Sequence, residues 1–590
     1  MKILLLTHAY NCLCQRLHIE LSQLGHDVSI EFDINDDVCI NAVDRFKPEL
    51  IIAPFLKRAI PAQVWQHHLC WIVHPGIIGD RGPSSLDWAI INQEKSWGVT
   101  LLQANEEMDG GDIWASETFD MRVASKSSLY RQEVTTAAVN AVKSALNNLA
   151  DNSFTAKPLA KYTLADNAQW RCLMKQSDRS VNWQTDDSET VLRKVNSSDG
   201  NPGLLTQLLN NELQGREFYL YNASIEHGLS GKAGTIIAQK NDAIAIATID
   251  SAIWISHLCE NKVNTVISVN ENVDLLPHQK RSLKLPAALV IKNELANMSL
   301  QCAGSLGYKE VWHHTQTCET KDTQTKIAYL YFNFYNGAMS TKQCQALLAE
   351  YQLLAKSDAD VIMLMGGNDF FSNGIHLNVI EHSESAADES WCNINAMNDI
   401  CHAIINTTNK LTVAAINGNA GAGGVFLALS CDLVAANEEV VLNPHYKSMG
   451  NLYGSEYWTY TLPERVGAEQ ANSIMENRLP LGAIQARELG LLDFTFSKTL
   501  FLSELIKTVK NISSNDEFTN FIQAKKEKRE QDEQKKPLAQ YRAEELAQMN
   551  LNFYGFDPSY HVARYHFVYK LAKARTPAYL AKHRMSGYKG

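Results

Sequence analysis

The chain has 590 residues, 45% of them hydrophobic and 20% charged, which is ordinary for a globular protein but too long for a single core. A formal net charge of −11 argues against a nucleic-acid partner held by phosphate neutralisation, and no apolar run reaches the roughly 18 residues that a membrane span requires. We therefore expect about three domains in a soluble, cytoplasmic protein that binds neither nucleic acid nor a membrane.

The first part of the chain alternates short apolar runs with helix-like segments. Such alternation predicts an α/β domain over residues 1–155 with a mostly parallel, doubly wound sheet. Ligands of these sheets bind beyond the carboxyl ends of the strands. The predicted strands cover residues 2–8, 27–33, 49–55, 69–74 and 98–104, and the predicted helices lie near 14–24 and 129–150.

The character of the sequence changes after this domain. Short β-like runs separated by turn residues, such as FYLYNAS and AIWISHL, predict a small β-barrel over residues 156–290. The following stretch, 291–326, includes the polar run 315–326 and is predicted to be a linker.

From residue 327 the pattern is α/β again. A strand at 327–334, a helix at 340–356 and buried strands that begin at 359 and 411 predict a third domain over residues 327–520. The rest, 521–590, is predicted to be a helical extension. Its charge run 524–536 is most simply a solvated helix, and its aromatic-rich end is expected to pack on the body of the protein.

A first candidate site lies at the end of the strand 69–74. His74 stands there, and Asp109 precedes two glycines that let its loop approach a ligand closely. An aspartate that holds a histidine suits general acid–base catalysis, although a histidine–aspartate pair on its own is more often a structural hydrogen bond.

The sequence motifs around this pair are more informative. HPGIIGDRGPSSLDWAI, followed by WGVTLLQANEEMDGGDI, resembles the folate-dependent formyltransferases over about residues 1–125, and the stretch from about 165 to 265 resembles the carboxyl-terminal domain of methionyl-tRNA formyltransferase. The resemblance implies that His74 and Asp109 are catalytic and that 10-formyl-tetrahydrofolate is the formyl donor. Ile72 stands where that family has an asparagine, whose amide stabilises developing negative charge. Either formyl transfer to an ordinary amine acceptor is not expected, or a different group supplies the hydrogen-bond donor.

A second candidate site follows from two Gly-rich turns, GGNDFFSNGIHLN and AINGNAGAGGVFLAL. Two such turns can aim two backbone N–H groups at one thioester oxygen, which is an oxyanion hole. Their order and spacing resemble the crotonase (enoyl-CoA hydratase/isomerase) superfamily, with its ββα superhelix, over residues 327–500. The resemblance places the two N–H groups at Ile375 and Gly423 and implies coenzyme A as a ligand.

The two glutamates of the hydratases are missing from this second site. Phe426 stands at the first position, and the second falls at about Tyr446. Tyr446 and Glu456 are therefore our candidates for the proton donor and acceptor. The structural alternatives are a core tyrosine and a glutamate on a helix surface.

The fusion of these two modules is similar to the HoxX family of [NiFe]-hydrogenase maturation factors, over nearly the whole chain. That resemblance implies that 10-formyl-tetrahydrofolate passes its formyl group to coenzyme A, that formyl-CoA is decarbonylated to carbon monoxide, and that the hydrogenase large subunit or its maturation proteins are partners. No metal site is expected, because the sequence contains no Cys-x-x-Cys pair.

Two other interpretations remain open from the sequence. The chain can be a formyl-folate hydrolase or transferase, for example a formyl-sugar synthase, whose crotonase-like part serves assembly only. It can also be an assembly protein that delivers ligands and has lost activity at both sites, which the residues at positions 72, 426 and 446 favour. The intact His74, Asp109 and paired Gly-rich turns favour an enzyme.

Overall fold

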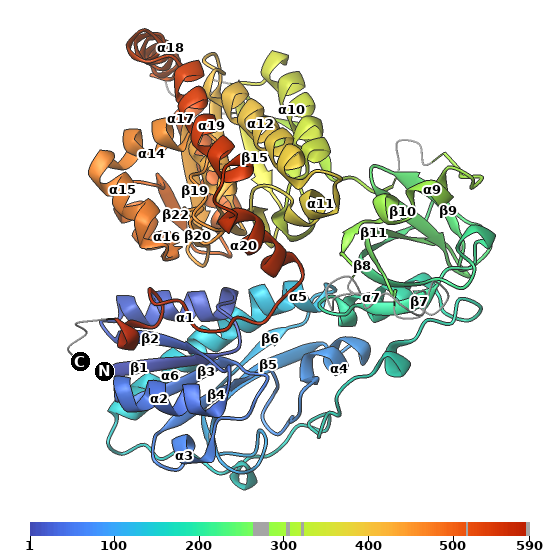
Figure 1. Cartoon of the computed structure of the whole chain (residues 1–590), viewed down its shortest axis with the longest axis vertical. Coiled ribbons are helices and arrows are strands. Elements are labelled where there is room, and N and C mark those ends of the chain that lie inside the picture. The colour runs from blue at the N-terminus through green and yellow to red at the C-terminus, as the bar shows by residue number, and fades with distance from the viewer. Residues whose placement is uncertain (263–281, 303–306, 320–323, 515–516, 586–590) are drawn as a thin grey trace. The chain divides into compact units, whose positions relative to one another are not determined.

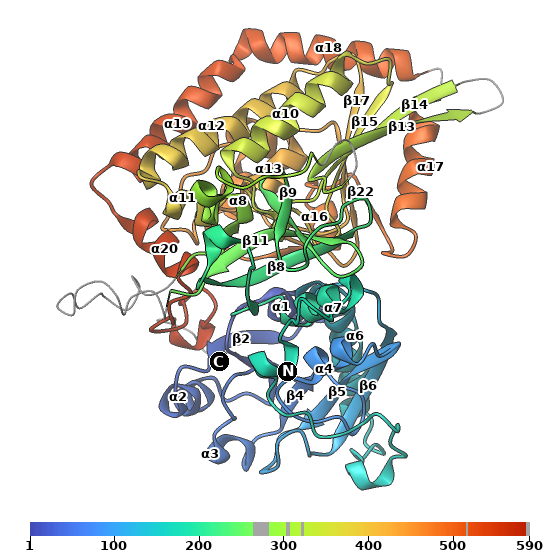
Figure 2. The same cartoon turned by 90° about the vertical axis from the view of Figure 1, so that its right-hand side faces the viewer.

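The computed structural model describes residues 1–262, 282–302, 307–319, 324–514 and 517–585. It consists of two compact units, which are coloured by position in the chain in Figures 1 and 2. The first unit contains Met1–Tyr308 together with Ala572–Gly590, and the second contains Lys309–Leu571. Each unit is described by itself.

The first unit begins with the predicted doubly wound sheet, whose strand order is β2-β1-β3-β4-β5-β6. Strands β1 to β4 run parallel, whereas β5 and β6 are antiparallel to their neighbours. The strands are β1 (Lys2–Thr7), β2 (Asp27–Phe32), β3 (Leu50–Phe55), β4 (Cys70–His74), β5 (Ser96–Gln103) and β6 (Ile113–Asp120). The sequence did not reveal β6, because most of its residues are only partly buried and its apolar pattern is weak.

Helices cover both faces of this sheet (Figure 1). On one face, Leu4 and Leu6 of β1 pack in one cluster with Val43 and Phe46 of α2, as alternating strand side chains require. The helices are α1 (Cys12–Gln23), α2 (Asp36–Phe46), α3 (Ala62–Trp65), α4 (Ser85–Ile91), α5 (Lys126–Leu129) and α6 (Thr135–Ala150), with a π-helical turn at Tyr130–Val134.

The barrel predicted for residues 156–290 is instead an open sheet. Its order is β7-β8-β11-β10-β9, with β12 beside β11, and β7 and β9 do not pair with each other in the described part of the chain. The physical reason is that helices cover the apolar face: Val191 and Val195 of α7 pack against Leu220 and Ile253. The elements are α7 (Ser188–Ser198), β7 (Leu204–Gln207), β8 (Glu217–Glu226), β9 (Ile236–Lys240), β10 (Ala243–Ala247), β11 (Ala252–Glu260), β12 (Leu285–Pro286), α8 (Ala287–Val290) and α9 (Lys292–Leu295).

The segment 291–326, which was predicted to be a linker, contains regular secondary structure. It contains α9 and β13 (Val311–Glu319), which pairs antiparallel with β14 (Gln324–Phe332). Figure 2 shows these two strands as a hairpin that extends past the rest of their sheet. Most of the side chains from His313 to Thr317 are exposed, so a polar composition is compatible with a strand at the edge of a sheet, and threonine favours that conformation.

The second unit is built on two sheets. The larger has the order β13-β14-β15-β17-β19-β22 and is parallel from β14 onwards, and the smaller has the order β16-β18-β20-β21. The strands after β14 are β15 (Val361–Gly366), β16 (Phe370–Ser372), β17 (Leu411–Ile416), β18 (Asn419–Gly421), β19 (Leu433–Asn437), β20 (Val441–Asn443), β21 (Leu481–Gly482) and β22 (Phe494–Phe496).

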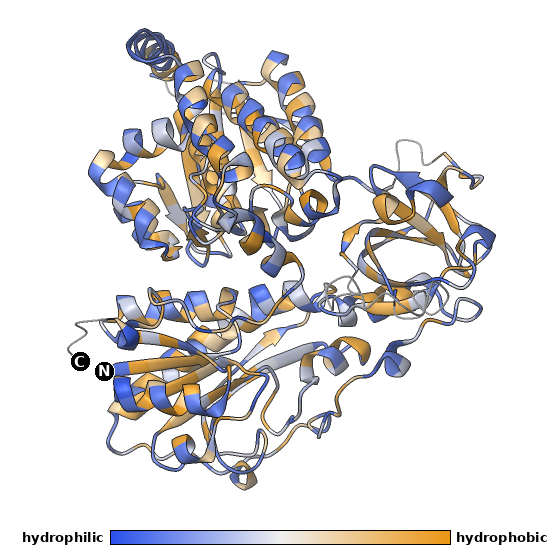
Figure 3. Cartoon of the chain, viewed as in Figure 1, coloured by the Kyte–Doolittle hydropathy of each residue, from blue (hydrophilic) through white to orange (hydrophobic). Residues whose placement is uncertain are grey.

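Helices pack on both faces of the larger sheet, and Figure 3 shows apolar residues concentrated on the strands. On one face, Leu330 and Leu364 share a core with α10 and α12. On the other, Val361 and Val413 pack against Leu505 of α17. The helices are α10 (Thr341–Lys356), α11 (Leu377–His382), α12 (Ala386–Ile405), α13 (Gly423–Leu429), α14 (Trp458–Val466), α15 (Ala468–Asn477), α16 (Ala483–Glu488), α17 (Phe501–Ser513), α18 (Phe518–Lys535), α19 (Leu538–Tyr554) and α20 (Ser559–Val568).

Candidate functional site

The first candidate site lies where β4 ends. His74 is the last residue of this strand and is only 4% exposed. Its Nδ1 lies 3.5 Å from Oδ2 of Asp109, which comes from the loop between β5 and β6. The structure therefore brings together the two residues that the sequence singled out.

The turn after His74 requires a small residue. A methyl group on Gly76 would overlap the imidazole of His74, so only glycine fits there. Two side chains of β5 fix this turn: Thr100 donates a hydrogen bond to the Gly76 carbonyl at 2.8 Å, and the Trp97 indole donates to the Pro75 carbonyl at 3.0 Å. The imidazole is thereby held in one place.

The Asp109 loop is fixed in a similar way. Asp109 has a left-handed backbone (φ 51°), and its Oδ2 also accepts a hydrogen bond from the Gly82 N–H at 3.0 Å. The Arg81 guanidinium donates to the Met108 carbonyl, with its shorter contact at 2.7 Å. The turn at Arg81 and Gly82 therefore holds the aspartate beside the histidine.

The other imidazole nitrogen is available. His74 Nε2 is buried and has no hydrogen-bond partner among the described residues. A buried polar atom without a partner is costly unless a ligand completes it. With Nδ1 facing a carboxylate, Nε2 is suited to accept a proton from a bound nucleophile.

Ile72 contributes no polar group to this site. It lies in β4 between Leu102 of β5 and Ala53 of β3, and it packs against the apolar cluster beside α2. The amide that formyltransferases carry at this position is therefore replaced by packing, and any stabilisation of an oxyanion has to come from other donors.

The two Gly-rich turns of the second unit meet as predicted. A methyl group added to Gly374, the residue before Ile375, would lie 3.2 Å from the Gly423 nitrogen. Gly423 begins α13, and the backbone hydrogen bonds of the described turns use neither the Ile375 nor the Gly423 N–H. Ala422 has φ 48° and ψ −129°, an unusual backbone for a residue with a side chain that sets the direction of the Gly423 N–H. Both N–H groups thus lack backbone partners in the described turns, which an oxyanion hole would require.

Tyr446 and Glu456 form a buried pair beside these turns. The Tyr446 hydroxyl donates to Glu456 Oε2 at 2.5 Å, and the two residues are 6% and 1% exposed. A methyl group on Gly423 would overlap Glu456 Oε1, so the carboxyl group lies directly beside this turn. The burial of Glu456 excludes a glutamate on a helix surface, whereas Tyr446 lies in the hydrophobic core, as its structural alternative expects, and is also paired with Glu456.

Burial controls the protonation of this pair. It raises the pKa of Glu456 to about 8; the negative charge of Glu545 acts in the same direction, and the hydrogen bond from Tyr446 opposes it. Burial, together with the neighbouring Glu456, raises the pKa of Tyr446 well above its usual value. A carboxyl group whose pKa lies near neutral pH can both donate and accept a proton.

Phe426, which the resemblance to crotonases places at the position of the first hydratase glutamate, is an aromatic core residue. It is fully buried and stacks on Tyr446, with ring centroids 5.3 Å apart and planes inclined by 16°. The two residues expected at the hydratase glutamate positions thus form one aromatic stack. The acidic group comes from Glu456, which lies in the segment between β20 and α14.

Sequence reasoning missed Glu545 on α19. Its side chain is fully buried and accepts hydrogen bonds from the residues around Glu456, including the Ser455 hydroxyl at 3.1 Å and the Tyr457 N–H at 3.0 Å. A glutamate in a charged C-terminal helix gives no sign of burial in the sequence, because glutamates in such helices are ordinarily solvated.

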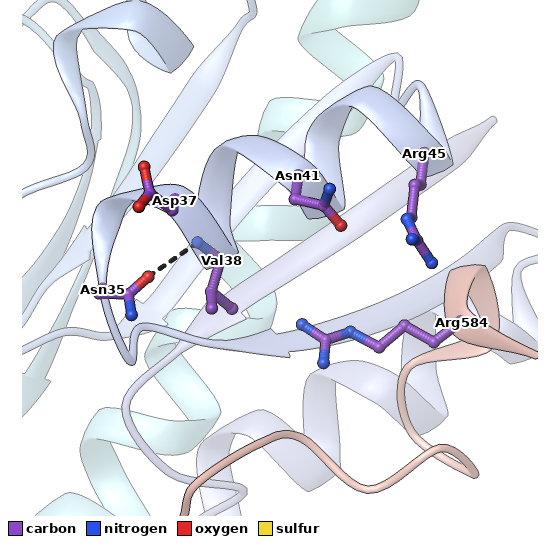
Figure 4. A pocket seen from close by; sticks show the side chains of 6 residues that line it. All are labelled: Asn35, Asp37, Val38, Asn41, Arg45 and Arg584. Carbon is purple, nitrogen blue, oxygen red and sulfur yellow. Dashed lines mark hydrogen bonds between the residues drawn. The ribbon is translucent and has the colours of Figure 1, made fainter.

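Other features of the described residues lie apart from both sites. A hollow of about 400 Å³ on the first unit is lined by α2 and by Arg584, and it contains none of the predicted site residues (Figure 4). In Figure 4 the Asn35 side chain caps α2 by accepting a hydrogen bond from the Val38 N–H. No group of three metal-ligating side chains and no helix capable of spanning a membrane occurs in the part of the chain that the structure describes.

Comparison with protein families agrees with this division. Residues 32–146 match the family described as formyl transferase, residues 173–268 match the formyl transferase C-terminal domain, and residues 323–556 match enoyl-CoA hydratase/isomerase. The third match extends past residue 520 and includes α19. The fold and the two sites thus define a class of protein in which a formyltransferase is joined to a crotonase-like module.

Full-length relatives narrow this class. Hydrogenase maturation factor HoxX of Bradyrhizobium diazoefficiens is 47% identical over 99% of this chain and 98% of its own. The crystal structure of HypX from Aquifex aeolicus in complex with tetrahydrofolic acid is 46% identical, with a TM-score of 0.90 and complete coverage of both chains. 4-Chlorobenzoyl coenzyme A dehalogenase-2 of Arthrobacter sp. is 26% identical over 34% of this chain and 73% of its own. The chain belongs to the HoxX/HypX family of hydrogenase maturation factors.

Proposed function

We propose that this protein makes carbon monoxide from 10-formyl-tetrahydrofolate, by formyl transfer to coenzyme A and decarbonylation of formyl-CoA, and that the product serves as the CO ligand in [NiFe]-hydrogenase maturation. The observation that carries the proposal is the buried Glu456–Tyr446 pair beside the turn at Gly423, in a site without hydratase glutamates. The tetrahydrofolic acid complex of the HypX relative supports folate as the donor at the first site.

At the first site His74 acts as the base. Its unpaired Nε2 accepts the proton of the CoA thiol while Asp109 stabilises the imidazolium through Nδ1. The thiolate attacks the formyl carbon, the bond from that carbon to N10 of the folate breaks, and the proton passes from His74 to N10. The products are tetrahydrofolate and formyl-CoA.

At the second site the Ile375 and Gly423 N–H groups polarise the formyl carbonyl of the thioester. The ionised Glu456 accepts the formyl proton while the carbon–sulfur bond breaks, which releases carbon monoxide and the thiolate. The proton then passes to sulfur, and Tyr446 keeps the carboxyl group in position through its hydrogen bond. Formyl-CoA thus gives carbon monoxide and CoA thiol, with no oxidant or reductant required.

The test uses the purified full chain with 10-formyl-tetrahydrofolate, with and without coenzyme A, and measures carbon monoxide, formate and formyl-CoA. We expect carbon monoxide that depends on both substrates. Formate as the sole product would show a hydrolase with a non-catalytic crotonase-like unit. The absence of any turnover would favour an assembly protein that delivers ligands. Either result would overturn the proposal.

A further inference from the structure

Glu545 of α19 is a buried carboxylate outside the predicted machinery of the second site. Both of its oxygens accept hydrogen bonds from one segment. Oε2 accepts from the Tyr457 N–H at 3.0 Å and the Ser455 hydroxyl at 3.1 Å, and Oε1 accepts from the Thr459 N–H at 2.9 Å and the Thr459 hydroxyl at 2.6 Å. One side chain from the C-terminal helices thus holds three residues around Glu456.

The segment held by Glu545 has an unfavourable backbone. Glu456 and Tyr457 are consecutive left-handed residues, with φ values of 60° and 58°. Such conformations cost on the order of 1 kcal/mol or more for residues other than glycine and persist only when the surroundings enforce them. Asn398 of α12 holds the same segment from another side, because its Oδ1 accepts from the Glu456 N–H at 2.7 Å.

This backbone determines where the Glu456 carboxyl group lies. With Glu456 left-handed, its carboxyl group lies beside Gly423 and within reach of the Tyr446 hydroxyl. Relaxation of the segment would turn the carboxyl group away from the oxyanion hole. A displacement of about 1 Å in a catalytic group can cost on the order of 10²-fold in rate.

Glu545 also acts on Glu456 through its charge. Its own pKa is raised by burial to about 7, and as it ionises it raises the pKa of Glu456. The other titratable groups that face Glu456 come from the segment after β20 and from α10 and α12: they are Tyr446, Cys344 and Cys401.

We propose that Glu545 is a positioning residue of the decarbonylation site, which holds Glu456 in its left-handed conformation. This inference rests on the proposed function of Glu456. It makes the C-terminal helix α19 part of the second site, although α19 contributes neither the oxyanion hole nor the proton acceptor.

The test supplies formyl-CoA directly, so that the first site is bypassed, and follows carbon monoxide release as a function of pH. In Glu545→Gln we expect kcat to fall by about tenfold to a hundredfold with little change in KM, because Glu456 is displaced. We also expect the pH midpoint of the ascending limb to move to lower pH, because a negative charge that opposes ionisation of Glu456 is removed. A merely structural residue would not move this midpoint.

Two further variants make the test specific. Glu544→Gln changes the neighbouring, exposed glutamate of α19, which bonds Lys536, and we expect wild-type rates and an unchanged pH profile. Ser455→Ala removes the hydroxyl that contacts both Glu545 and Asn398, without changing any charge, and we expect a several-fold lower kcat with the midpoint unmoved. Ser455→Ala also tests the positioning role if Glu545→Gln does not fold.

The outcomes separate the two proposals. Loss of carbon monoxide release in Glu456→Gln, together with wild-type kcat and midpoint in folded Glu545→Gln, would overturn the positioning role and leave the proposed function intact. Wild-type kcat in Ser455→Ala would overturn the positioning role if Glu545→Gln does not fold. Undiminished carbon monoxide release in Glu456→Gln would overturn the proposed role of Glu456 and, with it, that of Glu545.

Discussion

His74 and Glu456 illustrate how a buried polar side chain becomes available for chemistry. Each is almost fully enclosed; His74 faces Asp109 in the first unit, and Glu456 accepts from the Tyr446 hydroxyl and the Ser455 N–H in the second. In each case a second polar atom remains beside a glycine, where a larger residue would overlap it. The glycines at positions 76 and 423 are therefore as necessary to the two sites as the acid–base residues beside them.

The first prediction concerns the histidine and its carboxylate. We expect His74→Ala to abolish formation of tetrahydrofolate from 10-formyl-tetrahydrofolate in the presence of coenzyme A, because it removes the imidazole proposed to accept the thiol proton. Asp109→Ala should do the same, because it removes the carboxylate beside Nδ1 and a hydrogen-bond acceptor of the Gly82 N–H. The measurement is the rate of tetrahydrofolate release.

The matched control for this prediction is His67→Ala, which removes an exposed histidine whose Nδ1 contacts only the Gln63 carbonyl. This control should retain the wild-type rate. Turnover at the wild-type rate in both His74→Ala and Asp109→Ala would contradict the roles given to these residues.

At the scale of elements, turns complete both sites: the loop between β5 and β6 brings Asp109 to the end of β4, and the turn before α13 brings Gly423 beside Glu456. The sharp turn from β18 into α13 passes through Ala422, whose backbone is strained, and ends at Gly423. This turn aims one N–H at the site and leaves just enough room for the Glu456 carboxyl group. The strain is consistent with a turn shaped for binding, since such backbones cluster at functional sites.

The second prediction tests that turn. We expect Gly423→Ala to lower carbon monoxide release from formyl-CoA by about 10²-fold or more, because the added methyl group would displace Glu456 and narrow the oxyanion hole. Formation of formyl-CoA should be unchanged, so this thioester should accumulate, and chromatography of the CoA species measures it.

Gly200→Ala serves as the control for this substitution, because a methyl group there meets no atom closer than 3.8 Å. Its carbon monoxide output should equal that of the wild type. Wild-type carbon monoxide release in Gly423→Ala would show that the turn does not form the site.

Much of the fold around the first site could be predicted from the sequence, because it depends on the local pattern of apolar residues. The apolar run that ends at His74 predicts a buried strand whose carboxyl end is a place for a ligand, and the resemblance to formyltransferases, rather than this pattern, implies that Asp109 is its catalytic partner. The role of Glu545 could not be predicted. It depends on where α19 packs, and no periodicity in a charged helix indicates which carboxylate is buried.

Errors at the element scale have the same origin. The expected barrel failed because strand patterning predicts strands but not whether the last one pairs with the first. The expected linker failed because β13 is an edge strand with one neighbour, and exposed polar residues are what such a strand can carry. In both cases the residues specify the element and the tertiary context decides its partners.

At the scale of the whole molecule, the chain returns to its first unit after completing the second. Residues Ala572–Gly590 belong to the first unit, and the Leu580 carbonyl accepts a hydrogen bond from Ile30 of β2 at 3.0 Å. The second unit is therefore an insertion in the first, anchored at both of its ends. No local signal in the sequence indicates such an insertion, because it is a property of long-range contacts.

Glu31 of β2 contacts this C-terminal segment and holds it to the first unit. Its side chain is fully buried in β2, and it contacts three residues of the returning segment: His583 Nε2 at 3.0 Å, Arg584 at 2.7 Å and the Thr576 hydroxyl. The other nitrogen of His583 lies 2.8 Å from the Ser29 hydroxyl. Removal of one partner of a buried carboxylate strongly destabilises the fold, because part of the buried charge is then left without compensation.

The third prediction follows from this arrangement. We expect His583→Ala to destabilise the attachment of the C-terminal segment by about 3 kcal/mol, because it removes a buried partner of both Glu31 and Ser29. Amide hydrogen exchange in β2 should become correspondingly faster in the full chain, while exchange in the sheets of the second unit should be unchanged.

Lys582→Ala is the matched control, because it removes an adjacent, partly exposed ion pair with Asp27 that is worth less than about 1 kcal/mol. Equal exchange of β2 in the two variants would mean that Glu31 does not hold the segment, since only the buried contact distinguishes them.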